Sequence, residues 1–317
     1  FRKDREEETA MRDYKNDILE AGRELEFPEE GTQALFEAWE KLAAGAAMPG
    51  ETGKNAGAAA EFLAWIEKYE RDEAMDYGAA LEAAKKAGEQ TGVHPYTAQL
   101  LLFLCMTAHL KELYEEKGIR TDIWRDSCKD LKWKLLECYR MYGIWGSFVA
   151  GWFPGFFELT RFALGRLQFE LVDFPEGYEK AGRKKPEQMT KAINVHIPSC
   201  GKLNMDECHA SYRQAADFFS EYFPGDEVAV CCESWMLYLP HKQFLGADSG
   251  VVRFMDEYDI YETYEQDGDL WRIFNCDYQG DPDGLAEDTG MQRGYKRWLQ
   301  QGHHAGCGKG VFFLKKA

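Results

Sequence analysis

The spacing of apolar residues changes near position 145, and this change constrains the fold more than any other feature. Before it, apolar residues recur every three or four positions, as in "AAAEFLAWIEKYERD" (58–72) and "HPYTAQLLLFLCMTAHLKELYEEKG" (94–118). That spacing is typical of amphipathic α-helices, and strand-like alternation does not occur. Gly-rich stretches such as "MPGETGKNAG" (48–57) predict loops between the helices. The first part of the chain is therefore predicted to be all helical.

After Gly146 the pattern becomes that of a sheet interrupted by helices. Short segments rich in Val, Ile and Phe are bounded by Gly and Pro, which is typical of strands. The segments with this character cover residues 164–174, 191–198, 227–237, 251–265, 270–275 and 310–314. Asn204 can cap a helix between two of them. A Thr-x-x-Gln capping box at Thr289 marks the start of a last helix, which is predicted to end at Gly302.

Length and pattern together define the predicted architecture. A chain of 317 residues exceeds what one hydrophobic core usually serves, so two domains are expected. We predict an α+β protein with an all-helical N-terminal domain over residues 1–130 and a mixed-sheet domain over residues 131–317.

The charge of the chain restricts its partners. The formal net charge of −17 repels phosphate backbones and anionic lipid heads, which argues against nucleic acid and membrane partners. No apolar run reaches the roughly 18–20 residues that span a bilayer. The charge is also uneven, since residues 289–317 hold six Lys or Arg and no acid, whereas residues 254–288 hold twelve acids and one Arg. An anionic small ligand can therefore still meet a positive surface locally.

The cysteines and the first residues indicate the compartment. The nine cysteines are odd in number, scattered and without any Cys-x-x-Cys pair, unlike a secreted disulfide framework. The stretch "RKDREEET" after Phe1 lacks the apolar core of a signal peptide, and Phe1 is not expected to be the natural start. We expect reduced thiols in a cytoplasmic protein.

The segment "NVHIPSCGK" (194–202) combines a strand, a turn and a helix start. Asn194 and His196 are expected on one face of the strand, because side chains alternate along it. The turn that follows consists of Ser199, Cys200, Gly201 and Lys202. It leads into a helix whose first N–H groups can bind an anion such as a pyrophosphate, with the Lys202 ammonium beside it.

Two other interpretations of this segment have less support. A nucleophile–base pair of Cys200 and His196 would need a third, orienting group, and none is apparent nearby. A metal site would need more ligands, and the spacing of His303, His304 and Cys307 fits no zinc pattern. We therefore predict no bound metal and no structural disulfide.

Polar residues at strand ends supply further candidates. Glu233 and Ser234 lie where an apolar strand turns polar, a usual place for site residues, although Glu233 can also be simply solvated. Arg253 stands in an otherwise acidic region. It can contact an anion or pair with a neighbouring acid.

An ordered series of segments resembles a known family. In chain order it reads "YGIWGSF", "LTRFALGRLQFEL", "VHIP", "FFSEYFP", "CCESWML", "VVRF" and "DTGMQRGYKRWLQQG". The series is similar to a bacterial acyltransferase family with a helical N-acyltransferase N-terminal domain and a GNAT-like C-terminal domain. The resemblance is strongest over about residues 120–314, and "LGRLQFE" and "CESWML" are its most specific pieces.

This resemblance implies a splayed mixed sheet that holds acyl-coenzyme A. In GNAT-type enzymes the pyrophosphate lies on the turn between the fourth strand and the next helix, the place that Ser199 to Lys202 would occupy. The strand "EVAVCCESWML" would be the fifth. This chain has only Gly201 in place of the usual Gln/Arg-x-x-Gly-x-Gly. A near match, "HHAGCG" (303–308), runs into the last predicted strand instead of opening a helix.

The resemblance also implies roles. Such enzymes transfer the acyl group directly from the thioester to an amine, while a base removes the amine proton and an acid protonates the thiolate. His196 and Glu233 are the expected base candidates, with His196 ranked first. Tyr258 or Tyr261 is the expected acid, and Arg253 is expected to contact coenzyme A.

We accordingly predict an acyl-CoA-dependent N-acyltransferase, with coenzyme A or acyl-CoA as co-substrate and a small-molecule amine as acceptor. The alternative is a binding or sensor protein that keeps the same sheet without turnover, which the absent glycine-rich loop motivates. A third hypothesis is a structural protein whose helical part recruits a partner.

Overall fold

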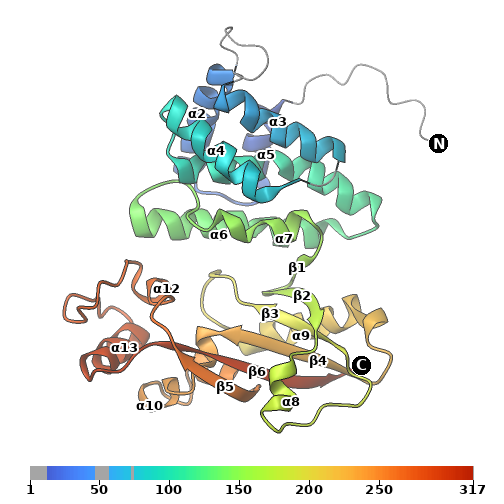
Figure 1. The fold of residues 1–317 in the computed structure, drawn as a ribbon, viewed down its shortest axis with the longest axis vertical. Helices are drawn as coiled ribbons and strands as arrows, with labels where there is room; N and C mark the ends of the chain where they lie inside the picture. Colours follow the sequence, from blue (N-terminus) through green and yellow to red (C-terminus); the bar gives the residue numbers. More distant parts are fainter. Residues whose placement is uncertain (1–12, 47–56, 73–74, 317) are drawn as a thin grey trace. The chain divides into compact units, whose positions relative to one another are not determined.

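The computed structural model describes residues 13–46, 57–72 and 75–316. The chain separates into two compact units, and the division falls between Glu158 and Leu159 (Figure 1). Residue 130, where the sequence suggested a boundary, lies inside helix α6 (Thr121–Tyr142). The predicted loop over 48–57 lies outside the described residues except for its last position.

The first unit is helical, as predicted. Besides α6, its helices are α1 (Tyr14–Glu24), α2 (Glu29–Ala46), α3 (Ala58–Asp72), α4 (Tyr77–Thr91), α5 (Pro95–Glu116) and the short α7 (Pro154–Phe157), and a 3-10 turn, η1 (Ala150–Trp152), precedes α7. Helix α5 begins at Pro95 and ends just before Gly118, whose φ of 69° lies in the left-handed region that glycine tolerates. No helix in the described ranges is long and apolar enough to cross a membrane.

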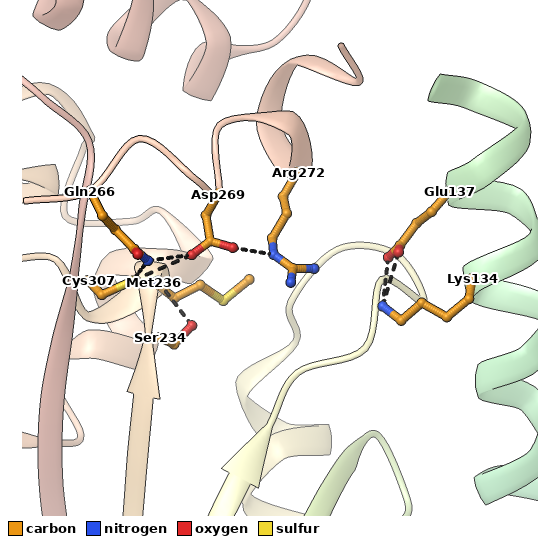
Figure 2. A network of polar contacts seen from close by, with 8 residues as sticks. All are labelled: Lys134, Glu137, Ser234, Met236, Gln266, Asp269, Arg272 and Cys307. Carbon is orange, nitrogen blue, oxygen red and sulfur yellow. Dashed lines mark hydrogen bonds and ion pairs between the residues drawn. The ribbon is translucent and has the colours of Figure 1, made fainter. Parts of the chain in front are cut away.

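Helix α6 buries an apolar stripe and a polar pair. The stripe includes Trp124, Leu131, Leu135 and Cys138, which are all buried. On the same helix the Lys134 ammonium lies 3.0 Å from the Glu137 carboxylate, and both side chains are almost fully covered (Figure 2). The pairing offsets the cost of removing two charges from water.

The second unit is built on one six-stranded sheet. Its strands are β1 (Arg161–Leu164), β2 (Leu167–Asp173), β3 (Lys191–His196), β4 (Glu227–Ser234), β5 (Asp259–Glu265) and β6 (Gly306–Lys315). Their order across the sheet is β1-β2-β3-β4-β6-β5, and only β3 and β4 run parallel (Figure 1). A helical first part followed by a mixed sheet confirms the predicted α+β class.

Helices and short 3-10 turns connect the strands. They are α8 (Glu176–Lys180), α9 (Met205–Phe218), η2 (Ser220–Tyr222), η3 (Trp235–Leu237), α10 (His241–Phe244), α11 (Gly250–Met255), α12 (Trp271–Phe274) and α13 (Gly290–Gln300). Two starts follow the predicted caps. The Asn204 side chain accepts from the Asp206 N–H at α9, and Thr289 and Gln292 form the capping box of α13.

Two segments predicted as strands are partly or wholly helical. Residues 251–255 belong to α11, so the strand predicted over 251–265 begins only at Asp259. Residues 271–274 form α12 instead of a strand. There Leu270, Ile273 and Phe274 are buried at positions i, i+3 and i+4, which is helical spacing within a run too short to show its period.

The sheet has one apolar face and one mixed face. On the first, Tyr212 of α9 packs on Phe169 of β2 and Phe312 of β6, with ring centroids 6.3 and 5.0 Å apart, and we call it the α9 face. On the opposite face α8 covers one end, where the Tyr178 ring contacts Phe313. The other end of that opposite face carries polar side chains, namely Glu170, Asn194, His196 and Glu233.

Candidate functional site

The backbone ladder between β3 and β4 ends before either strand does. Their ladder, in the part of the chain that the structure describes, has two pairs, Ile193 with Val230 and Asn194 with Cys231. Both strands then continue, β3 to His196 and β4 to Ser234. Beyond the last pair, the Cys232 thiol reaches the Val195 carbonyl at 3.5 Å. The backbone ladder thus ends before the carboxyl ends of the two parallel strands, the kind of place where open sheets commonly bind ligands.

His196 lies at the end of β3 among polar neighbours. Its Nε2 is 2.9 Å from Oε2 of Glu170 on β2 and 3.2 Å from the Asn194 amide nitrogen. Glu170 also pairs with the Arg161 guanidinium at 2.5 Å. Burial alone would raise the pKa of the Glu170 carboxyl, but the hydrogen bonds and charges of His196 and Arg161 outweigh it and lower that pKa. Glu170 is therefore ionised at neutral pH.

Glu233 lies on the same face as His196. Asn194 and Cys231 are register partners, and His196 and Glu233 each follow two residues later on their strands. The Tyr264 hydroxyl donates to Glu233 Oε1 at 2.6 Å. The Lys309 ammonium lies 4.0 Å from Glu233 and 3.1 Å from Glu262. The bond to Glu233, followed by burial, raises the pKa of Tyr264, so that phenol stays protonated.

The turn from Ser199 to Lys202 wraps around Arg166, which lies between β1 and β2. One guanidinium nitrogen is 2.6 Å from the Cys200 sulfur, and another donates to the carbonyls of Gly201 at 3.0 Å and Lys202 at 3.4 Å. The Arg166 side chain is only 5% exposed, whereas Ser199, Gly201 and Lys202 are exposed. Arg166 thus fixes the turn from inside and leaves its outer surface to solvent.

The remaining predicted residues lie in three different places. Tyr258 is buried on the α9 face, where its hydroxyl is 3.0 Å from the Tyr212 hydroxyl. Tyr261 is half-buried on β5; burial, with the nearby carboxylates of Glu262 and Glu233, raises its pKa to about 12. Arg253 is exposed on α11, and the first residue of that helix, Gly250, lies directly against Leu203.

A polar network lies at the end of the sheet where β4 finishes at Ser234. Figure 2 shows Gln266, which donates to Asp269 at 2.8 Å and contacts the Cys307 sulfur at 2.7 Å. Arg272 donates to the other oxygen of Asp269 at 2.7 Å. Ser234 accepts from the Met236 N–H and caps η3, so it holds the chain that leaves β4.

Other histidines do not form a metal centre. Within the described residues no group of three or more His, Cys, Asp or Glu side chains gathers around one point. The His303 ring stacks on Trp298, His304 pairs with Asp267 at 2.9 Å, and Cys307 is buried in β6. His241 is fully buried against the Tyr295 hydroxyl, and burial lowers its pKa to about 4. None of the nine cysteines, which all lie in the described part of the chain, forms a disulfide.

Sequence reasoning missed the partners of the predicted residues. Arg166 and Glu170 both lie within "LGRLQFE", but nothing local in that stretch showed that they reach Cys200 and His196. Tyr264 and Lys309 were missed for the same reason. Pairing β2 with β3 in register would have been the signal, because Glu170 faces Asn194 in that ladder.

Comparison with known proteins gives a consistent result. The model of an N-acyltransferase N-terminal domain matches residues 16–159, and that of a GNAT-like C-terminal domain matches residues 161–312. A sequence search among curated proteins gives no match.

Two solved structures share the fold of the chain. An acyltransferase mutant in complex with octanoyl-CoA has a TM-score of 0.69 at 21% identity, over 95% of this chain and 88% of the other. An acyltransferase in complex with decanoyl-CoA and teicoplanin has a TM-score of 0.65 at 21% identity, with the same coverage.

Proposed function

Because the chain belongs to the acyltransferase family that joins an N-acyltransferase N-terminal domain to a GNAT-like C-terminal domain, we propose that it moves an acyl group from acyl-coenzyme A to a small-molecule amine. One observation carries the proposal most directly. The backbone ladder of β3 and β4 ends at Asn194 and Cys231, two residues before His196 and Glu233, which can handle a proton, and β3 then leads into an exposed turn at a helix start.

The acyl-CoA donor would bind along the end of the β3–β4 ladder. The pyrophosphate would contact the turn of Ser199, Cys200, Gly201 and Lys202, supported by its exposure and its place before α9. Arg253 would add a cation from α11, which begins against Leu203. The thioester would then reach the gap beyond Asn194, and medium-length donors are the ones held by the similar structures.

The chemistry would be direct transfer. The amine nitrogen attacks the thioester carbonyl carbon, the carbon–sulfur bond breaks, and coenzyme A leaves as a thiolate. His196 takes the proton of the amine, and Glu233 orients the amine or a water. The thiolate takes a proton from Tyr261, a phenol whose pKa is raised by burial so that it carries the proton at neutral pH. Tyr258 is the weaker candidate, because it is buried on the α9 face against Tyr212, on the opposite side of the sheet from His196 and Glu233.

The test is turnover with defined donors. Purified protein is incubated with octanoyl-CoA or decanoyl-CoA and a panel of primary amines, and free coenzyme A thiol is measured alongside the mass of the acylated amine. Amine-dependent thiol release supports the enzyme. Coenzyme A binding by calorimetry without thiol release across the panel would instead support the sensor alternative, and absence of binding would refute both.

Gly201→Val is expected to weaken coenzyme A binding about tenfold. Gly201 has a φ of 113°, a backbone conformation that costs valine on the order of 1–3 kcal/mol, so the turn must change shape. A Cβ there would meet no protein atom within 4 Å, so the added side chain would project from the turn without displacing protein atoms. Calorimetry checks the affinity.

Gly225→Val is the matched control, because its Cβ also meets nothing within 4 Å and its φ is not positive. Unchanged affinity in folded Gly201→Val would remove the turn from the binding site. Equal loss in both variants would do the same.

The compartment and partners are proposed on composition. The nine free thiols support a reducing, cytoplasmic location. The net charge of −17 supports a small-molecule acceptor over nucleic acid or an anionic membrane surface.

A further inference from the structure

Three ionisable side chains form a row across the first three strands of the sheet. Arg161 of β1, Glu170 of β2 and His196 of β3 are joined by contacts of 2.5 and 2.9 Å. Strand register produces the row, because Arg161 faces Glu170 and Glu170 faces Asn194, two residues before His196. All three side chains are at most 21% exposed. Such contacts are only weakly screened by water.

Arg161, at one end of this row, keeps its neighbour Glu170 ionised. Arginine keeps its proton in proteins, so Arg161 presents a permanent cation to Glu170. Glu170 is then an anion that can only accept hydrogen bonds. The nearby Cys231 remains a neutral thiol, since burial raises its pKa to about 12. Glu170 is therefore an anion in contact with the imidazole.

An ionised Glu170 decides which nitrogen of His196 carries the hydrogen. If Nε2 had none, its lone pair would face the carboxylate at 2.9 Å, with the neutral Asn194 amide as a donor at 3.2 Å. A hydrogen bond to a charged group is roughly twice as strong as one between neutral groups. The Nε2–H form therefore prevails, and the lone pair of the neutral ring is on Nδ1.

We propose that Glu170 is a positioning residue for acyl transfer, which holds His196 in the Nε2–H form so that Nδ1 accepts the proton of the attacking amine. The inference rests on the proposed function. When the amine N–H bond breaks, the proton moves to Nδ1 and the ring becomes an imidazolium. Glu170 stays ionised throughout and stabilises that cation, while Arg161 holds Glu170 in place.

The test replaces the carboxylate with an amide of the same shape. In Glu170→Gln the imidazolium loses its anionic partner, so the acidic limb of the kcat/KM–pH profile should move about one unit towards lower pH. The plateau should fall roughly tenfold, because the base is weaker. Nitrogen NMR of ring-labelled histidine should show loss of the Nε2–H preference. Asp173→Asn is the matched control, since Asp173 on the same strand pairs with Lys191 of β3 and does not touch His196; it should change neither readout.

Several outcomes would overturn the inference. An unmoved acidic limb together with a retained Nε2–H ring in Glu170→Gln removes Glu170 from the mechanism, and equal changes in Asp173→Asn make the effect nonspecific. If the single variant unfolds because Arg161 loses its carboxylate, the double variant Arg161→Gln and Glu170→Gln removes both charges and is measured instead. If the wild type turns over no amine, the proposed function fails. The NMR arm then still decides whether Glu170 sets the ring form.

Discussion

His196→Ala is expected to lower kcat/KM for amine acylation by ~10²–10⁴-fold, the usual contribution of a positioned base. The imidazole lies at the end of β3, beyond the last backbone pair between β3 and β4, and imidazole is the side chain that most often serves as a general base. A base must be neutral to accept a proton. Wild-type activity should therefore fall on the acidic side of its pH profile, where a protonated imidazole can no longer act as the base.

The acidic limb of the pH–rate profile identifies the base. In His196→Ala the acidic limb should disappear, whereas Glu233→Gln should lose less rate and keep it, because the Tyr264 hydroxyl can still bond the amide oxygen. His209→Ala serves as control, since His209 lies on α9 and pairs with Glu257, which follows α11. pH–rate profiles of the three variants provide the measurement. If His196→Ala and Glu233→Gln both retain the full rate and an unshifted limb, the base lies elsewhere on the sheet.

Gly308→Ala is expected to destabilise the second unit by about 3 kcal/mol, the upper end of ordinary overpacking. A Cβ at Gly308 would lie 2.1 Å from the Leu237 carbonyl oxygen and 2.7 Å from its carbonyl carbon. These are backbone atoms of η3, so no side chain can rotate away. The 3-10 turn would have to lift off β6. The urea midpoint, followed by far-UV circular dichroism, reports the loss.

Gly225→Ala is the control for Gly308→Ala, because its Cβ meets no atom within 4 Å. It should stay within about 0.5 kcal/mol of the wild type. An unchanged midpoint for Gly308→Ala would mean that η3 does not pack on β6 as described. Since η3 directly follows Glu233 and Ser234, a displaced turn should also lower the acyl-transfer rate.

Local pattern was enough for most of the secondary structure. The helices of the first unit, the Asn204 cap and the capping box at Thr289 depend on residues within one or two turns of each other, so the sequence shows them directly. The pattern failed over 251–255 and 271–274, where short apolar runs fit a strand or a helix equally well. Packing against the rest of the unit decided for helices α11 and α12.

The candidate site was also predictable only in the part that depends on local sequence. Alternation along β3 and β4 predicts that Asn194 shares a face with His196, and Cys231 with Glu233, because the period of a strand is local. What the sequence could not supply is the neighbour across a ladder. Glu170 is 26 residues from His196, and Tyr264 is 31 from Glu233. Those contacts depend on register between distant segments, which is set by the burial of the whole sheet, so only the tertiary structure decided which charges surround the two proposed catalytic side chains.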